Sequence, residues 1–71
     1  MEAEIIEVRH SADVGAARTA ARNMAAAIGF DETADEEAAL AASELASNMV
    51  KHAGGGALTL TPLAEGGRRG I

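Results

Sequence analysis

The sequence predicts an α+β fold, and three observations lead to this prediction. Apolar residues recur at helical spacing over residues 12–28 and again over 34–52. Strand-like segments flank these two stretches, with mixed β-branched residues at 4–9 and period-two alternation at 57–61. Turn-forming residues at 65–67 predict a hairpin, after which 68–71 begins a returning strand. The order strand, helix, helix, strand, strand start predicts a two-layer sandwich, in which a helical hairpin packs on a short, mainly antiparallel sheet.

The element boundaries follow from short local signals. Ser11 is expected to cap the first helix, because its side chain can accept a hydrogen bond from a free backbone N–H. Thr33 and Glu36 have the spacing of a capping box, so Thr33 is expected to cap the second helix. The glycines at 54–56 are expected to end that helix, and Pro62 the strand that follows.

Composition limits the classes of function. The chain has 71 residues, enough for one small domain or part of one, and much of its 48% apolar content is alanine. It has no cysteine, so it has no disulfide and no thiolate metal site. Its net charge of −5 argues against nucleic-acid binding. Neither a leader nor a membrane-spanning run is visible, so we expect a cytoplasmic protein that does not bind membranes.

Polar side chains that could bind a ligand or take part in catalysis lie along one side of the second predicted helix. Glu44, Asn48 and Lys51 are spaced i, i+4 and i+7, which places them within an arc of roughly 60°. His52 flanks the same arc. A separate side is expected to pack on the sheet, and it carries Ala38, Ala42, Leu45 and Met49.

These residue types have distinct capabilities. A carboxylate can accept a proton or align a nucleophile. A carboxamide oxygen can bind Mg²⁺, and a lysine one turn further on can contact a phosphate. The spacing alone equally fits a solvated helix face. Arg18 and Arg22 on the first helix are interpreted as a solvated edge, because long basic side chains commonly lie along helix surfaces.

The segment Glu44-Leu-Ala-Ser-Asn48-Met-Val-Lys-His52-Ala-Gly-Gly resembles the N-box of the Bergerat-fold ATPases, a group that includes gyrase, chaperone and histidine-kinase ATP domains. Within this group it is most similar to the anti-sigma serine/threonine kinases and the switch kinases of bacterial stress signalling. Outside the box the resemblance rests on Ala17-Arg18, Ala21-Arg22, Gly29-Phe30 and the hairpin residues 67–71. Many switch kinases carry a basic residue before the asparagine, where this chain has Ser47.

The resemblance implies that residues 1–71 are the N-terminal part of a single ATPase or kinase domain with a partial Bergerat fold. The segment ends before the Asp-x-Gly-x-Gly box and the lid of that family, so we expect it to be inactive alone. By resemblance, Glu44 is the catalytic acid that activates the attacking hydroxyl, and Asn48 is the Mg²⁺ ligand. Asn48, Lys51 and His52 would lie near ATP. The implied partner is an antagonist protein phosphorylated on serine or threonine, with a sigma factor or phosphatase as further partners and the oligomeric state open.

Two alternatives remain at this stage. The chain could be an interaction module without catalysis, or the ATPase portion of a histidine kinase. An Asp-x-Gly-x-Gly box further along the same reading frame would favour an ATPase, and an upstream helix bearing a phosphorylatable histidine would favour the histidine kinase.

Overall fold

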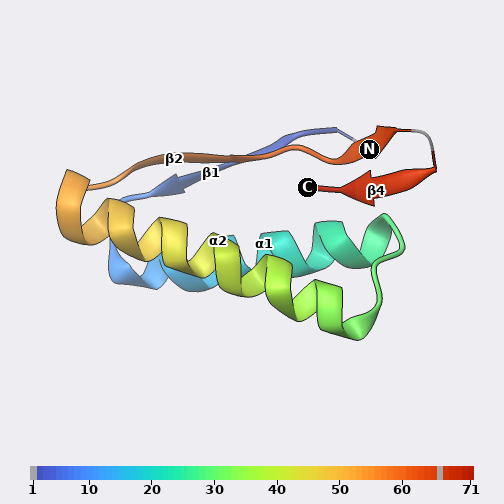
Figure 1. Ribbon diagram of the computed structural model, residues 1–71. Helices are drawn as coiled ribbons and strands as arrows, with labels where there is room; N and C mark the ends of the chain where they lie inside the picture. The colour runs from blue at the N-terminus through green and yellow to red at the C-terminus, as the bar shows by residue number, and fades with distance from the viewer. Residues whose placement is uncertain (1, 66) are drawn as a thin grey trace.

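A computed structural model describes residues 2–65 and 67–71, with only the backbone of Glu65. The elements are β1 (Glu4–Val8), α1 (Ser11–Ala27), α2 (Glu32–Ala53), β2 (Gly56–Leu60), β3 (Leu63–Glu65) and β4 (Arg68–Gly70). The two helices form an antiparallel hairpin in one layer, and the strands form the other (Figure 1). The predicted α+β class is therefore confirmed, and the predicted helix and strand boundaries agree within two residues.

The strands form two antiparallel pairs instead of the single sheet expected from the sequence. β1 pairs with β2, so that Ile6 lies opposite Leu58 and Val8 opposite Gly56, and β3 pairs with β4. The chain leaves β2 at Thr61 and Pro62 before β3 begins. Proline has no backbone N–H to donate to a neighbouring strand, which explains why the ladder is interrupted here. The hairpin turn predicted at 65–67 connects β3 to β4, although Gly66 lies outside the described residues.

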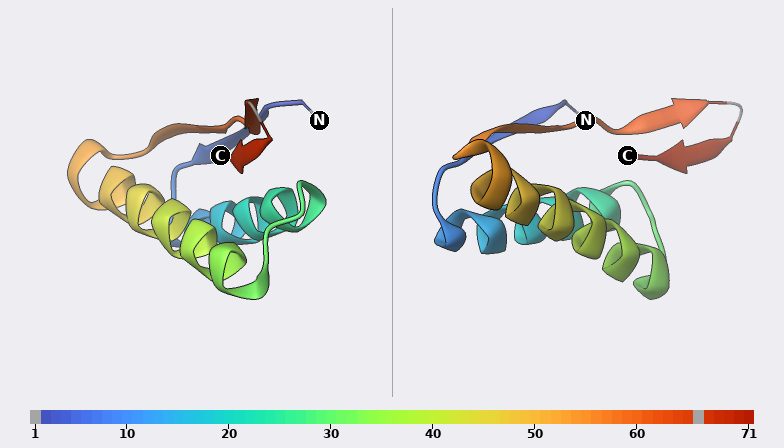
Figure 2. Two further views of the ribbon diagram at one scale, coloured as in Figure 1. Left: turned by 45° about the vertical axis from the view of Figure 1, so that its right-hand side comes forward. Right: turned by 60° about the vertical axis from the view of Figure 1, so that its left-hand side comes forward.

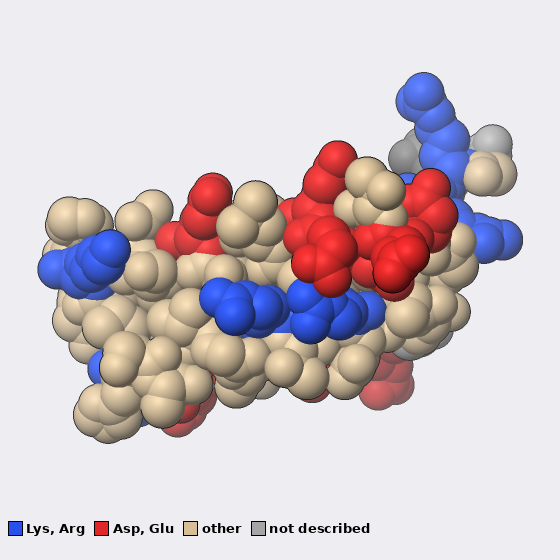
Figure 3. All heavy atoms as spheres, turned by 90° about the horizontal axis from the view of Figure 1, so that it is seen from below, with Lys and Arg blue, Asp and Glu red and all other residues tan. Residues whose placement is uncertain are grey.

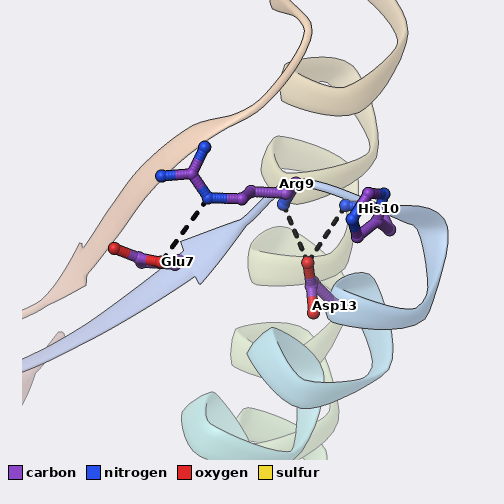
Figure 4. A network of polar contacts seen from close by, with 4 residues as sticks. All are labelled: Glu7, Arg9, His10 and Asp13. Carbon is purple, nitrogen blue, oxygen red and sulfur yellow. Dashed lines mark hydrogen bonds and ion pairs between the residues drawn. The ribbon is translucent and has the colours of Figure 1, made fainter.

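The start of α1 differs from the prediction, because Ser11 is the first helical residue and not the cap. His10 occupies the cap position with an extended backbone. The carboxylate of Asp13 reaches back and accepts hydrogen bonds from the backbone N–H groups of Arg9 (2.8 Å) and His10 (3.0 Å) (Figure 4). An acidic side chain in the first turn also favours the positive end of the helix dipole. The capping interaction therefore comes from inside the helix.

Asp31, and not Thr33, caps α2. Its Oδ1 accepts a hydrogen bond from the backbone N–H of Ala34 at 2.8 Å, and the helix has already begun at Glu32. Aspartate is as good a cap as threonine, and the earlier site adds helical residues. The other end follows the prediction: Gly54 adopts the left-handed conformation (φ 70°), and the next N–H bonds to the carbonyl of Met49 at 2.9 Å.

Alanine dominates the core. Ala17, Ala21 and Ala25 of α1 are buried, as are Ala39, Ala42 and Ala46 of α2, so small side chains let the helices approach closely. Val8 is the largest fully buried side chain among the described residues. Apolar residues on the inner face of β1 and β2 complete two adjoining clusters, with Ile6 and Leu58 contacting both.

The prediction that Leu45 packs on the sheet is wrong. Ala42 is buried and Met49 packs against the cluster around Val8, but Leu45 is 56% exposed. Since Leu45 lies about 100° around the helix from its neighbour Ala46, which is fully buried, it is directed to the flank of α2 and not to its core side. Within the described residues, neither helix has the length and apolarity needed to cross a bilayer.

Candidate functional site

Three of the four predicted site residues line one shallow hollow between the helices. Glu44, Asn48 and Lys51 of α2 face it together with Val14 and Arg18 of α1, and Ser43 and Ser47 complete its wall. The hollow has a volume of about 410 Å³. His52 is exposed in the last turn of α2 but does not line the hollow. The helical spacing therefore identified a real cluster, to which His52 is peripheral.

The carboxylate, amide and ammonium groups of this hollow are accessible. Glu44, Asn48 and Lys51 are all exposed. The ion pairs among the described residues are Arg9–Glu7 at 3.5 Å and Arg22–Glu36 at 3.0 Å, so neither the carboxylate of Glu44 nor the ammonium of Lys51 is engaged in one. Seen from the helical side, basic side chains lie along the middle of the face and acidic side chains gather beside them (Figure 3).

Arg18 belongs to this site, although its sequence context predicted only a solvated helix edge. Its Nη2 and Nε donate to the Oγ of Ser43 at 3.2 and 3.4 Å. Ser43 is only 6% exposed and directly precedes Glu44. Arg22 also reaches across to α2, where it pairs with Glu36. The two arginines directly follow Ala17 and Ala21, which are buried at the helix–helix contact, so their side chains lie close to α2. No local sequence pattern distinguishes them from solvated arginines.

The donor set fits Mg²⁺ only in combination with water and phosphate. Among residues 2–65 and 67–71, no group of three or more His, Cys, Asp or Glu side chains could hold a metal ion. Mg²⁺ does not need such a cage, because it commonly keeps several waters and binds one or two protein oxygens plus substrate phosphates. The exposed amide of Asn48, beside an exposed carboxylate and ammonium, suits that mode of binding.

An apolar groove runs along the adjacent flank of α2. It has a volume of about 560 Å³ and lies between Ala38, Ala41 and Leu45 on the helix and Thr59 and Leu60 on β2. Phe30, Leu63 and Ile71 also line it. Glu44 and Leu45 are consecutive, so the polar hollow and the apolar groove occupy neighbouring sides of the same helical turns. Small-molecule sites commonly combine an apolar cleft with a few placed polar groups.

Comparison with known proteins identifies no relative: no family model matches the chain, and no curated protein or solved structure matches it.

Proposed function

We propose that this chain carries the metal-side half of a Bergerat-type ATP site and serves in ATP-dependent phosphorylation of a serine or threonine on an antagonist protein. The observation that supports this proposal is the pairing of two features on α2. Glu44, Asn48 and Lys51 line one polar hollow, and an apolar groove that begins at Leu45 lies beside it.

Each side chain has a part in the proposed chemistry. Asn48 would supply a neutral oxygen to Mg²⁺, which in turn would neutralise phosphate charge. Lys51 would contact the phosphates, and Glu44 would orient the attacking hydroxyl and accept its proton. His52, at the C-terminal end of α2, would lie at the edge of the nucleotide. We place this activity in a bacterial cytoplasm, with a sigma factor or phosphatase as further partners.

A second candidate function is a non-catalytic partner-binding module. The observation that favours it is the exposure of large apolar side chains at the groove, with Leu45 56% and Leu63 58% exposed. Exposed apolar patches of this kind mark interaction sites in many proteins. An ATPase portion of a histidine kinase would share the α2 residues and differ in its phosphate acceptor.

The decisive experiment is a titration of the isotope-labelled chain with Mg-ATP, followed by NMR. The proposal predicts shifts centred on Glu44, Asn48 and Lys51, with an affinity of about 1 mM, since the shallow hollow offers the nucleotide few contacts. Asn48→Ala should move these shifts to about tenfold higher Mg-ATP concentration, whereas Asn23→Ala should not. Asn23 is a matched control because it is an exposed asparagine on α1 that lies outside the hollow. Shifts confined to the groove and unchanged by Asn48→Ala would favour the partner-binding module instead.

A further inference from the structure

The β3–β4 hairpin is only loosely joined to the rest of the molecule. Its strands pair with each other, and no ladder connects them to β1 or β2 within the described residues. Thr61 and Pro62 separate it from β2, and it projects beyond the β1–β2 pair (Figure 2). Leu63 is 58% exposed, so movement of the hairpin would lose little apolar burial from this side chain. Something other than sheet pairing must therefore hold it in place.

Arg69 provides that attachment. Its Nη1 donates to the backbone carbonyl of Ile28 at 3.1 Å, across 41 residues of sequence. Ile28 is the C-terminal cap of α1, where helix carbonyls lack partners within the helix and carry partial negative charge. The last turn of α1 has no basic residue of its own, whereas that of α2 has Lys51 and His52. Arg69 thus brings to α1 the cation that its own sequence lacks.

Gly29 makes room for this contact. It has a left-handed backbone with φ 91°, and a Cβ at this position would collide with Nη1 of Arg69. The left-handed backbone is what requires glycine here, and any larger residue would also force the flexible guanidinium of Arg69 to shift. The contact joins the start of the α1–α2 connection to the middle of β4.

Two residues at the hairpin contribute to the wall of the apolar groove. Leu63 of β3 and Ile71, which follows β4, line the groove together with Ala38 and Leu45 of α2. We propose that the β3–β4 hairpin is a hinged flap over this groove, latched to the C-terminal end of α1 by Arg69 and pivoting at Thr61–Pro62. Release of Arg69 from Ile28 would let the hairpin swing away and open the groove. The hinged motion of the hairpin is independent of the proposed kinase function.

Amide hydrogen exchange measured residue by residue tests the latch. In Arg69→Gln, the amides of β3 and β4 should exchange about three to ten times faster, the equivalent of one hydrogen bond, while those of α1, α2 and β1–β2 keep their rates. Arg68→Gln is the matched control, because Arg68 is the exposed neighbour of Arg69 in the same strand and should leave exchange unchanged. Arg69→Lys, which retains a cation and a donor, should fall between the two.

Thiol labelling supplies a second readout that reports the groove itself. The chain has no cysteine, so Ala38→Cys places a single thiol in the groove wall. Adding Arg69→Gln should raise its labelling rate by the same three- to tenfold factor expected for one lost hydrogen bond, with no change for Thr19→Cys, which is exposed on α1 and outside the groove. The proposal is overturned if Arg69→Gln behaves like Arg68→Gln, if all elements accelerate together, or if the hairpin amides are unprotected in the unmodified chain.

Discussion

Arg18 of α1 donates a hydrogen bond from Nη2 to the Oγ of Ser43 on α2 at 3.2 Å. Ser43 directly precedes Glu44 in the sequence. Ser43 is the buried polar residue of the described core, and its hydroxyl lies between the two helices. An alanine-rich interface has few interlocking side chains to fix how α2 is rotated against α1. The Arg18–Ser43 contact adds a directional constraint, and it supports the orientation in which Glu44, Asn48 and Lys51 share one hollow.

A double-mutant cycle should detect this contact. Arg18→Gln and Ser43→Ala should each lower the free energy of unfolding, and their effects should be non-additive by about 0.5–1.5 kcal/mol, the net value of one hydrogen bond. Urea unfolding measures all four variants. Arg18→Gln combined with Ser47→Ala is the control, because Ser47 lines the same hollow without bonding to Arg18. Equal coupling in both cycles would show that the contact has no specific energetic role.

The close approach of the helices should make the core intolerant of larger residues. Ala17 and Ala46 are both fully buried and lie in one cluster with Val8. Ala46→Leu should therefore destabilise the chain by about 1–3 kcal/mol, because the helices must separate to admit the side chain. Ala16→Leu, at an exposed position on α1, should leave the unfolding free energy within about 0.5 kcal/mol of its original value. A neutral Ala46→Leu would mean that the helices are not closely packed.

Two glycines with open surroundings should respond to alanine in opposite directions. A Cβ at Gly15 or Gly54 would meet no atom within 4 Å, so packing does not distinguish the two sites. Gly15 lies within α1, where alanine should stabilise by about 0.4–1 kcal/mol through a smaller loss of chain entropy. Gly54 has φ 70°, and alanine there should cost about 1 kcal/mol because of its left-handed backbone. Thermal unfolding measures the change in stability of each variant. If both variants were stabilised or both destabilised, Gly54 would not be the left-handed cap of α2.

Acid should weaken the start of α1. Hydrogen bonds from the backbone N–H groups of Arg9 and then His10 lower the pKa of Asp13 below its usual value. A carboxylate with a lowered folded-state pKa adds stability above its unfolded pKa of about 4, and this stability is lost as the pH falls through the lower folded value. Asp13→Asn should therefore be less stable than the original chain at pH 7, and the difference should shrink below about pH 4. Urea unfolding across this range provides the test, and a difference independent of pH would exclude the ionised carboxylate as the cause.

The two helices could be predicted from the sequence, whereas their N-terminal caps and the side-chain contacts between elements could not. Periodicity depends on many residues at once, so α1, α2 and the shared side of Glu44, Asn48 and Lys51 could be predicted. A helix cap depends on one side chain, and nearby residues can take the same role. Asp31, two residues before Thr33, caps α2, and Asp13 caps the start of α1 from within the helix. The contacts Arg18–Ser43 and Arg69–Ile28 join residues 25 and 41 positions apart, and no local pattern encodes which surface arginine will find a distant acceptor. The exposure of Leu45 also depends on residues far away in the sequence, because it is set by how far β2 extends over the flank of α2.

Nucleotide binding measured with and without Mg²⁺ should distinguish the residue that binds the metal ion from the residue that contacts phosphate directly. If Asn48 acts as a ligand of Mg²⁺, Asn48→Ala should weaken Mg-ATP binding by about tenfold, or 1.4 kcal/mol, and should have no effect on ATP in the presence of EDTA. Lys51→Ala should weaken binding in both conditions, because an ammonium contacts phosphate without the metal. Glu44→Ala should retain the affinity, because its proposed role concerns the attacking hydroxyl and not the bound nucleotide. NMR titration of the three variants with and without Mg²⁺ separates these roles, and an effect of Asn48→Ala that persists in EDTA would exclude its assignment as the magnesium ligand.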